Sequence, residues 1–384
     1  MRRIPVRELR AGSYFDSPVF LDDNYILLAP DTPTTEVLLR RLALWEFREV
    51  TTDGSPVGSP PTESANGPQQ AGALSADLKE EESRRDTLDR YKKVVAATDT
   101  ILERFKSKDE LRISEVTDAV KELIDLVKSK PRYALSLPDI ETQDKGFLVS
   151  HAVKTGILSI ALADFLKLPP HRIIEVGIAG LLHTIGMLRI PSDIYLSDRP
   201  LSQKEKQMII AQPILGFRSL KAAGFPMPIC LAVLEHHERI DGSGYPRNLL
   251  GEKLSLYGKI LAVASSYVAA VSARPFREAR DGHSGIMDLL RDMGKMYDEK
   301  VLRALVFTLS IYPIGTYVEL ANGSRGVVVK TTPETPKLPV VKLFVNQTGE
   351  PYLERPVLQT EESGDLSVSR PLTPEEVRRL KLTT

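Results

Sequence analysis

Apolar side chains recur at helical spacing almost without interruption from about residue 112 to residue 310. The segment DKGFLVSHAVKTGILSIALADFL predicts a long helix that ends before Pro169, and RIIEVGIAGLLHTIGML is apolar on most sides. A helix that is apolar all round belongs in the interior of a domain. The pattern therefore predicts a mainly α fold built on a helical bundle.

The two ends of the chain differ from this helical region. Residues 1–54 combine short strand-like runs with one helical pattern that includes Trp45, so we expect a small N-terminal α/β unit with Trp45 in its core. Residues 313–384 alternate apolar and polar side chains around Asn322-Gly323 and then carry a short helical pattern in the tail. This pattern predicts a small C-terminal β appendage.

Three further segments complete the expected domain organisation. Residues 55–76 are rich in Gly, Pro and Ser, and such a stretch buries too little apolar surface to fold, so it is predicted to be a flexible linker. Residues 77–134 have mixed charges at helical spacing and predict a helical connector. This connector fits either a solvated flanking helix or a coiled coil that forms a homodimer. Residues 135–312 form the main helical domain.

The composition limits the partners and the compartment. Basic and acidic residues number 51 each, so the net charge is zero, and nothing in it favours a nucleic acid polymer or an anionic membrane. The single cysteine, Cys230, cannot form an internal disulfide, which suits a reducing compartment. The N-terminal run MRRIPVREL lacks the apolar core of a signal peptide, and apolar runs fall short of the roughly 20 residues that span a bilayer. We therefore expect a cytoplasmic protein.

Four of the six histidines lie on the apolar helical segments: His151, His183, His236 and His237. Burying an imidazole is costly unless a hydrogen bond, an anion or a metal compensates it. Four such residues on neighbouring helices fit a shared metal or anion site, and they also fit four separately satisfied core histidines. Spacing alone leaves both interpretations open.

The run HHERIDGSGYP, which begins at His236, resembles the signature of HD-GYP domains. The helix that carries His151, the pair His183-Thr184 and the segment RPFR extend this resemblance over about residues 135–312. The resemblance implies an HD-type helical bundle. Members of this family are bacterial hydrolases of cyclic di-GMP, and their helices hold two or three metal ions, often iron or manganese.

The chain departs from the family at three positions that the resemblance assigns to metal ligands. The four histidines match, but Thr184 and Ser265 stand where the family has aspartates, and Gln212 stands where it has a histidine. Losing both carboxylates removes the negative charge that offsets two divalent cations. We therefore expect no confident catalytic residue, and either no metal or one residual iron, manganese or zinc ion on the four histidines.

The resemblance also implies a set of nucleotide-binding residues. Arg274 and Arg277 match family positions that contact phosphates, and a guanidinium binds phosphate without a metal. Tyr245 is expected to stack on or hydrogen-bond a guanine, with Asp241 and Gly244 beside it. The alternative is that Asp241 to Pro246 is a structural turn and that the arginines are ordinary surface charges.

These observations favour a catalytically impaired HD-GYP protein that acts as a signalling module by binding. Its expected partners are cyclic di-GMP or a related nucleotide, and another protein. The alternative is an active metal-dependent cyclic di-GMP phosphodiesterase with an altered metal site, for which the four retained histidines argue. A scaffolding protein is the third hypothesis, motivated by the N-terminal unit, the linker and the charged connector.

Overall fold

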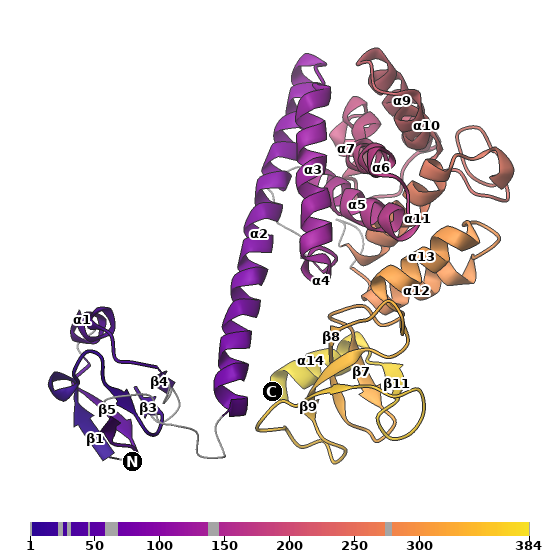
Figure 1. The fold of residues 1–384 in the computed structure, drawn as a ribbon. Coiled ribbons are helices and arrows are strands. Elements are labelled where there is room, and N and C mark those ends of the chain that lie inside the picture. Colours follow the sequence, from indigo (N-terminus) through magenta and orange to yellow (C-terminus); the bar gives the residue numbers. More distant parts are fainter. Residues whose placement is uncertain are drawn as a thin grey trace. The chain divides into compact units, whose positions relative to one another are not determined.

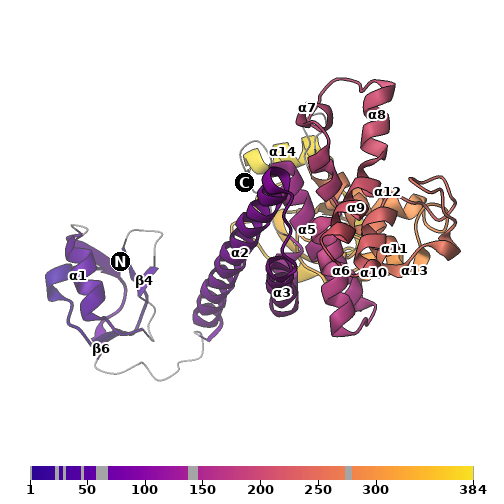
Figure 2. The same ribbon diagram turned by 90° about the horizontal axis from the view of Figure 1, so that it is seen from above.

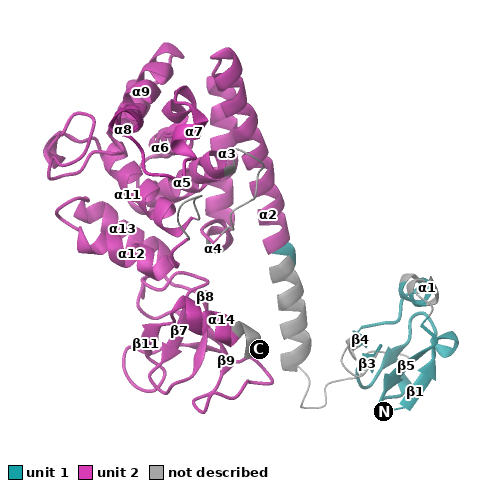
Figure 3. Cartoon of the chain, turned by 180° about the vertical axis from the view of Figure 1, so that it is seen from behind, with its two compact units in different colours: residues 1–83 teal, residues 84–384 magenta. Residues whose placement is uncertain are grey.

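The structure is a computed structural model, and it describes residues 2–21, 26–28, 32–44, 47–57, 68–136, 146–272 and 279–383. The chain divides into two compact units, residues 1–83 and residues 84–384 (Figure 3). Helices dominate the second unit, and strands occur in the first unit and near the C-terminus (Figure 1). The predicted fold class, a mainly α protein with small strand-containing parts at both ends of the chain, is confirmed.

The first unit contains a small antiparallel sheet with the strand order β1-β5-β3-β4, a two-stranded ribbon of β2 and β6, and the helix α1 (Glu36–Leu44). Its own apolar core includes Phe15, Val19, Leu42 and Val50, all buried. Trp45, which the sequence analysis assigned to this core, lies outside the described residues. The strands are β1 (Arg2–Pro5), β2 (Tyr14–Phe15), β3 (Val19–Phe20), β4 (Ile26–Leu28), β5 (Glu49–Thr52) and β6 (Pro56–Val57).

The helix α2 (Pro68–Lys108) corrects the predicted linker, because it begins inside the range 55–76. The richness in Gly, Pro and Ser that suggested a linker is confined to the residues before Pro68. Proline is favoured in the first turn of a helix, and the Ala, Gln, Leu, Lys and Glu residues that follow are strong helix formers. Helical propensity therefore extends further towards the N-terminus than the composition of the whole segment indicated.

The helix α3 (Ile113–Ser129) lies beside α2 and is followed by the short helix α4 (Pro131–Ala134) (Figures 1 and 2). Arg90 of α2 joins the two long helices, since its guanidinium donates to Glu122 at 2.7 Å and to Asp125 at 2.6 Å. Buried apolar side chains of α2 and α3 belong to the same core as the helices that follow. The part of the predicted connector from Arg84 onwards thus belongs to the second compact unit.

The main helical domain is built around α5, α6, α10 and α11, which pack against one another. The glycine at position 180 allows α5 and α6 to approach closely. A Cβ at Gly180 would lie 2.9 Å from the Cα of Gly156, a separation that only glycine permits. The helices are α5 (Gly146–Phe165), α6 (Pro170–Leu182), α7 (Ser192–Tyr195), α8 (Gln203–Ile210), α9 (Gln212–Ala222), α10 (Met227–Glu235), α11 (Leu256–Val271), α12 (Gly282–Arg291) and α13 (Glu299–Leu309), with short 3-10 helices at Ile185–Arg189 and Gly251–Lys253.

The helix α5 is the long helix that the sequence analysis predicted, and it is apolar over most of its length. By length and composition, its residues Phe147–Phe165 could cross a membrane, with a mean hydropathy of 1.3 over 19 residues. Within the domain, 83% of this window is buried. Such burial is typical of a core helix, whose apolar surface faces other helices on every side.

The C-terminal part is a five-stranded antiparallel sheet with the order β10-β9-β8-β7-β11, followed by the helix α14 (Pro374–Thr383). The predicted turn joins β7 to β8, where Gly323 has a φ of +86° and the Ser324 amide donates to the Asn322 side chain at 2.9 Å. Buried side chains alternate along β8 and β9, as the sequence pattern indicated. The strands are β7 (Tyr317–Leu320), β8 (Arg325–Lys330), β9 (Val340–Val345), β10 (Val357–Gln359) and β11 (Val368–Pro371).

Candidate ligand pocket

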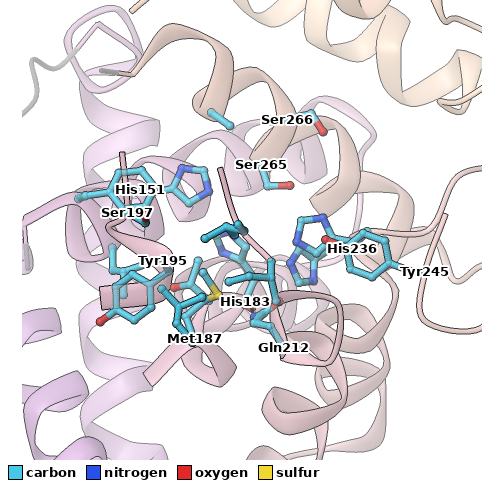
Figure 4. Close-up of a pocket in the computed structure, with 18 of the residues that line it drawn as sticks. His151, His183, Met187, Tyr195, Ser197, Gln212, His236, Tyr245, Ser265 and Ser266 are labelled. Carbon is cyan, nitrogen blue, oxygen red and sulfur yellow. Dashed lines mark hydrogen bonds between the residues drawn. The ribbon is translucent and has the colours of Figure 1, made fainter. Parts of the chain in front are cut away.

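Four histidines, in or directly after three helices, lie next to one another, and Figure 4 shows His151, His183 and His236 among them. His151 belongs to α5, His183 directly follows α6, and the pair His236 and His237 directly follows α10. The ring centroids are 5.0 Å apart for His151 and His183, 5.1 Å for His183 and His236, and 4.0 Å for His236 and His237. The fold therefore brings together the four histidines that the sequence placed on separate helices.

The ends of α6 and α10 orient two of these imidazoles in the same way. The Nδ1 atom of His183 lies 2.7 Å from the Gly180 carbonyl oxygen, and that of His236 lies 2.7 Å from the Val233 carbonyl oxygen. A carbonyl oxygen only accepts, so each Nδ1 carries the proton and donates it. The last carbonyl groups of a helix have no hydrogen-bond donor within the helix, and here the two histidine side chains act as the donors. Each Nε2 is left as an acceptor, and that of His183 is buried with no hydrogen-bond partner among the described residues.

Burial keeps these imidazoles neutral. Removal from water lowers the pKa of His183 to about 4, although the hydrogen bond to the Gly180 carbonyl acts in the opposite direction. Burial also holds the pKa of His236 well below its ordinary value, and the neighbouring His237 and His183 add to this effect. At neutral pH both rings are therefore uncharged hydrogen-bonding groups.

The three residues that replace family ligands lie beside the histidines. The Gln212 side chain, at the start of α9, donates its amide to the His183 backbone carbonyl at 2.6 Å. Thr184 precedes the 3-10 helix Ile185–Arg189, and Ser265 lies in α11 (Figure 4). All three are buried and line the same cavity as the histidines. The structure thus brings these positions together, and none of the three supplies a carboxylate or an imidazole.

The cavity has a volume of about 740 Å³ and lies between α5, α9 and α11 and the residues that follow α6, α7 and α10. Its wall combines the neutral polar groups with apolar side chains such as Met187 and Tyr195 (Figure 4). The charged residues in the described part of the wall are Asp198, Arg199 and Arg239. A mostly apolar cavity of this size with a few convergent polar groups is typical of a small-molecule site.

The predicted GYP loop contributes one side chain to the wall of the cavity. Tyr245 lines it and stacks on His237, with ring centroids 4.7 Å apart. Asp241 and Gly244 are not in the wall. The Asp241 carboxylate accepts hydrogen bonds from Ser243, and a Cβ at Gly244 would lie 2.4 Å from the Cα of Glu238. Both therefore shape the loop, as the turn interpretation expects. Arg274 and Arg277 lie outside the described residues.

Sequence reasoning missed two buried glutamates that hold this loop. The Glu238 carboxylate accepts from the backbone amides of Arg247 at 2.7 Å and Leu249 at 3.1 Å. The Glu235 carboxylate accepts from the Arg247 guanidinium at 2.6 Å and from the Ser255 amide and hydroxyl. In the sequence, two acidic residues that flank a histidine pair resemble metal ligands. Their hydrogen bonds in the structure show instead that they hold the loop in place.

The described side chains do not fit the paired-metal site that the family resemblance implies. Among them, no three His, Cys, Asp or Glu residues are grouped so as to hold a metal ion. The one carboxylate in the described wall is Asp198, which follows α7. Two close divalent cations need an acidic ligand that bridges them, and Thr184 and Ser265 offer neutral hydroxyls instead.

Comparisons with known proteins match two family models to separate parts of the chain. The model of the HD domain family matches residues 137–301, and that of a KOW domain associated with HD domains matches residues 317–380. The cyclic di-GMP phosphodiesterase PA4108 of Pseudomonas aeruginosa is 29% identical over 95% of this chain and 90% of its own length. The cyclic di-GMP phosphodiesterase PdeB of Borreliella burgdorferi is 30% identical over 51% of this chain and 52% of its own length.

Among solved structures, Bd1817, an HDG"Y"P protein from Bdellovibrio bacteriovorus, matches 79% of this chain and 97% of its own, with 17% identity and a TM-score of 0.48. The family match and the named relatives cover the helices that form the cavity. Residues 137–301 therefore form an HD domain, and the chain is similar along most of its length to a protein named as a cyclic di-GMP phosphodiesterase.

Proposed function

We propose that this protein binds cyclic di-GMP in the histidine-lined cavity without hydrolysing it, and that it acts as a signalling module. The observation that carries this proposal is the chemistry of the cavity wall: hydroxyls and an amide at Thr184, Gln212 and Ser265 take the positions that the family uses for metal ligands. The named relatives act on cyclic di-GMP, which supports a cyclic dinucleotide as the ligand class.

The position of Gln212 strengthens the argument against a paired-metal centre. Its amide nitrogen is directed at the His183 backbone carbonyl and donates to it at 2.6 Å. A donating amide nitrogen has no lone pair for a metal. Together with the neutral Thr184 and Ser265, this leaves the site without the charge needed to stabilise two cations or to generate a metal-bound nucleophile.

Stacking and phosphate pairing would supply the binding energy instead. Tyr245 and His237 form an aromatic surface in the cavity wall, which suits the flat face of a guanine. Arg274 and Arg277 are proposed to pair with phosphates, as the family resemblance implies. Asp241 and Gly244 would act indirectly, by fixing the loop that presents Tyr245. A protein partner or a second copy of the chain would transmit the signal.

The second candidate function is hydrolysis of cyclic di-GMP with an altered metal site. The observation that favours it is the tautomer shared by His183 and His236, whose Nδ1–H groups are held by backbone carbonyls so that each Nε2 offers a lone pair. A hydrogen bond from one ring nitrogen to a backbone carbonyl orients an imidazole so that its other nitrogen can bind a metal. The relatives named as phosphodiesterases support the same reading.

One experiment separates the two functions. The full-length protein, supplied with Mn²⁺ or Fe²⁺ under reducing conditions, is analysed for bound metal, for cyclic di-GMP binding by calorimetry and for linear products by chromatography. We expect less than about one ion per chain, saturable binding and no turnover. Tyr245→Ala should weaken binding, whereas Tyr14→Ala, in the N-terminal unit, serves as the matched control.

Multiple turnovers that His236→Ala abolishes would refute the binding-only proposal and establish the hydrolase. Absence of both binding and turnover in the wild-type protein would refute both candidates and favour the scaffolding hypothesis.

A further inference from the structure

If the cavity binds a cyclic dinucleotide, as proposed above, it must supply positive charge for the phosphates, and the inference below rests on that proposed function. Each phosphodiester of such a ligand carries a negative charge that must be matched when water is displaced. In the described part of the wall, the permanently charged cations are Arg199 and Arg239. These two guanidinium groups differ sharply in their surroundings.

Arg199 is already neutralised by a carboxylate. Its guanidinium makes two hydrogen bonds to Glu205, at 3.0 Å and 2.6 Å, in the paired geometry that makes such contacts strong. Glu205 is itself fixed, because it forms a capping box with Ser202 at the start of α8. A phosphate would have to displace a matched, well-anchored anion to reach Arg199.

Arg239 has no such counterion among the residues that the structure describes. No carboxylate among the described residues lies within ion-pair distance of its guanidinium, although Glu235 and Glu238 are close in sequence. Those two carboxylates accept hydrogen bonds from Arg247, Leu249 and Ser255. The Glu235 and Glu238 carboxylates thus hold the loop through their hydrogen bonds.

The Arg239 side chain is nevertheless held in place. Its guanidinium carbon lies 4.9 Å from the centroid of the buried Tyr297 ring, and one nitrogen donates to the Glu238 backbone carbonyl at 3.1 Å. A guanidinium has five N–H donors, so the carbonyl leaves several for a ligand. A fixed orientation also lowers the entropy lost when a ligand binds.

Arg239 is close to the aromatic surface proposed for the base. Burial raises the pKa of the Tyr245 hydroxyl to about 12, and the positive charge of Arg239 acts in the opposite direction. Arg239, Tyr245 and His237 all line the cavity, and Tyr245 and His237 are stacked. A nucleotide whose base lies against these rings would have a phosphate within reach of the guanidinium.

From this arrangement we propose that Arg239 is a phosphate-binding cation of the cavity, in addition to Arg274 and Arg277, because it is the one guanidinium in the described wall that is held in place without a described counterion. Arg199 contributes to the shape of the rim, and its charge is used by Glu205. The Glu235 and Glu238 carboxylates serve this site indirectly, since their hydrogen bonds to the loop leave Arg239 without a carboxylate partner in the described part of the chain.

The test uses the full-length protein and two ligands, cyclic di-GMP and the uncharged nucleoside guanosine, in calorimetry at low and high ionic strength. Arg239→Gln should weaken cyclic di-GMP binding by about tenfold to a hundredfold, the usual effect of a lost charged hydrogen bond, and most at low salt. Guanosine affinity should change by less than about threefold, because the aromatic surface is intact. Arg239→Lys should recover part of the loss.

Arg199→Gln should change cyclic di-GMP affinity by less than about threefold, and Arg303→Gln, on the surface of α13, is the matched control for removing one charge. Equal cyclic di-GMP affinity in wild type and Arg239→Gln would overturn the inference and leave the proposed function standing. Equal losses for cyclic di-GMP and guanosine would also overturn it, by assigning Arg239 a purely structural role. Wild-type protein that binds no cyclic di-GMP would reject the proposed function, and the inference with it.

Discussion

The two buried glutamates beside the histidine pair have hydrogen bonds that fix the position of the GYP loop. Glu238 is 1% exposed and accepts two backbone amides, and Glu235 is 4% exposed and accepts from Arg247 and Ser255. An unpaired buried amide is costly, so these carboxylates compensate groups that a short loop cannot pair within itself. The position of the loop therefore depends on these residues next to the cavity as well as on those in its wall.

Glu238→Gln tests this role. The new amide would place an N–H₂ group against one of the two backbone donors, so a buried amide loses its acceptor. We expect the free energy of unfolding to fall by about 1–3 kcal/mol, measured by urea denaturation of the full chain. Glu354→Gln, an exposed position in the C-terminal part, should leave stability within about 0.5 kcal/mol of wild type. Equal stability of both variants would contradict the assigned role.

The stability that the ion pair between Glu376 and Arg370 contributes should depend on pH. The Arg370 guanidinium and then the Thr373 amide hold the pKa of Glu376 down, to about 2 from an ordinary 4.5. A lowered folded-state pKa contributes stability that is complete above pH 4.5 and is lost as the pH falls through 2. Glu376→Gln should therefore destabilise at pH 7 by less than about 1 kcal/mol, since the pair is partly exposed.

The difference in stability between wild type and Glu376→Gln should shrink progressively as the pH falls from about 5 towards 2. Urea denaturation at several pH values measures it. The exposed Glu362→Gln is the control, and its small difference from wild type should not follow this course. A difference for Glu376→Gln that stays constant over that range would argue against the assigned ion pair.

At the scale of elements, close contacts between helices set the shape of the cavity. The 3-10 helix Ile185–Arg189 meets the start of α9 at Gly186, where a Cβ would lie 2.1 Å from the Gln212 carbonyl oxygen and 2.7 Å from the Gly216 amide nitrogen. Backbone atoms cannot move aside as a flexible side chain can. The contact fixes Gln212 against the segment that carries His183 and Thr184.

Gly186→Ala should therefore separate these two elements. We expect destabilisation of about 1–3 kcal/mol from overpacking, measured by thermal or urea denaturation, together with weaker ligand binding. Gly156→Ala in α5 is the matched control, because the nearest atom to its new Cβ would be a Leu123 methyl at 3.4 Å. Alanine favours helix at that position, so the control should be neutral or slightly stabilising. If Gly156→Ala destabilised the protein more than Gly186→Ala, the close contact at Gly186 would be contradicted.

At the scale of the whole molecule, the chain has separate apolar cores. Residues 1–83 and 84–384 form distinct compact units, and the described buried apolar residues of the first unit form a cluster of their own. Units with separate cores can unfold independently, so the chain need not behave as a two-state protein. We expect calorimetry to resolve more than one thermal transition.

Matched core truncations assign these transitions. Leu42 in the first unit and Leu162 in the second are both fully buried, and each change to Ala should cost about 2–5 kcal/mol. Leu42→Ala should lower only one transition temperature in scanning calorimetry, and Leu162→Ala only another. A single transition that both variants shift by the same amount would show that the two cores unfold together.

The sequence by itself determined the elements and the family. Helical spacing through residues such as Leu162 and Val176, and alternation around Asn322-Gly323, fix local backbone preference, and the predicted bundle and β appendage followed from them. The string around His236 and Tyr245 indicated the HD-GYP family before any geometry was available. These signals are local, so a linear sequence contains them completely.

The tertiary structure decided which side chains meet. It placed Gln212 on the His183 carbonyl, turned the Glu235 and Glu238 carboxylates towards the loop, and put Arg239 over Tyr297 with no described carboxylate beside it. Charge compensation and hydrogen bonding depend on distances between residues far apart in the chain, and the packing of α5, α6, α10 and α11 sets those distances. The same acidic and basic residues in another packing would make a different site.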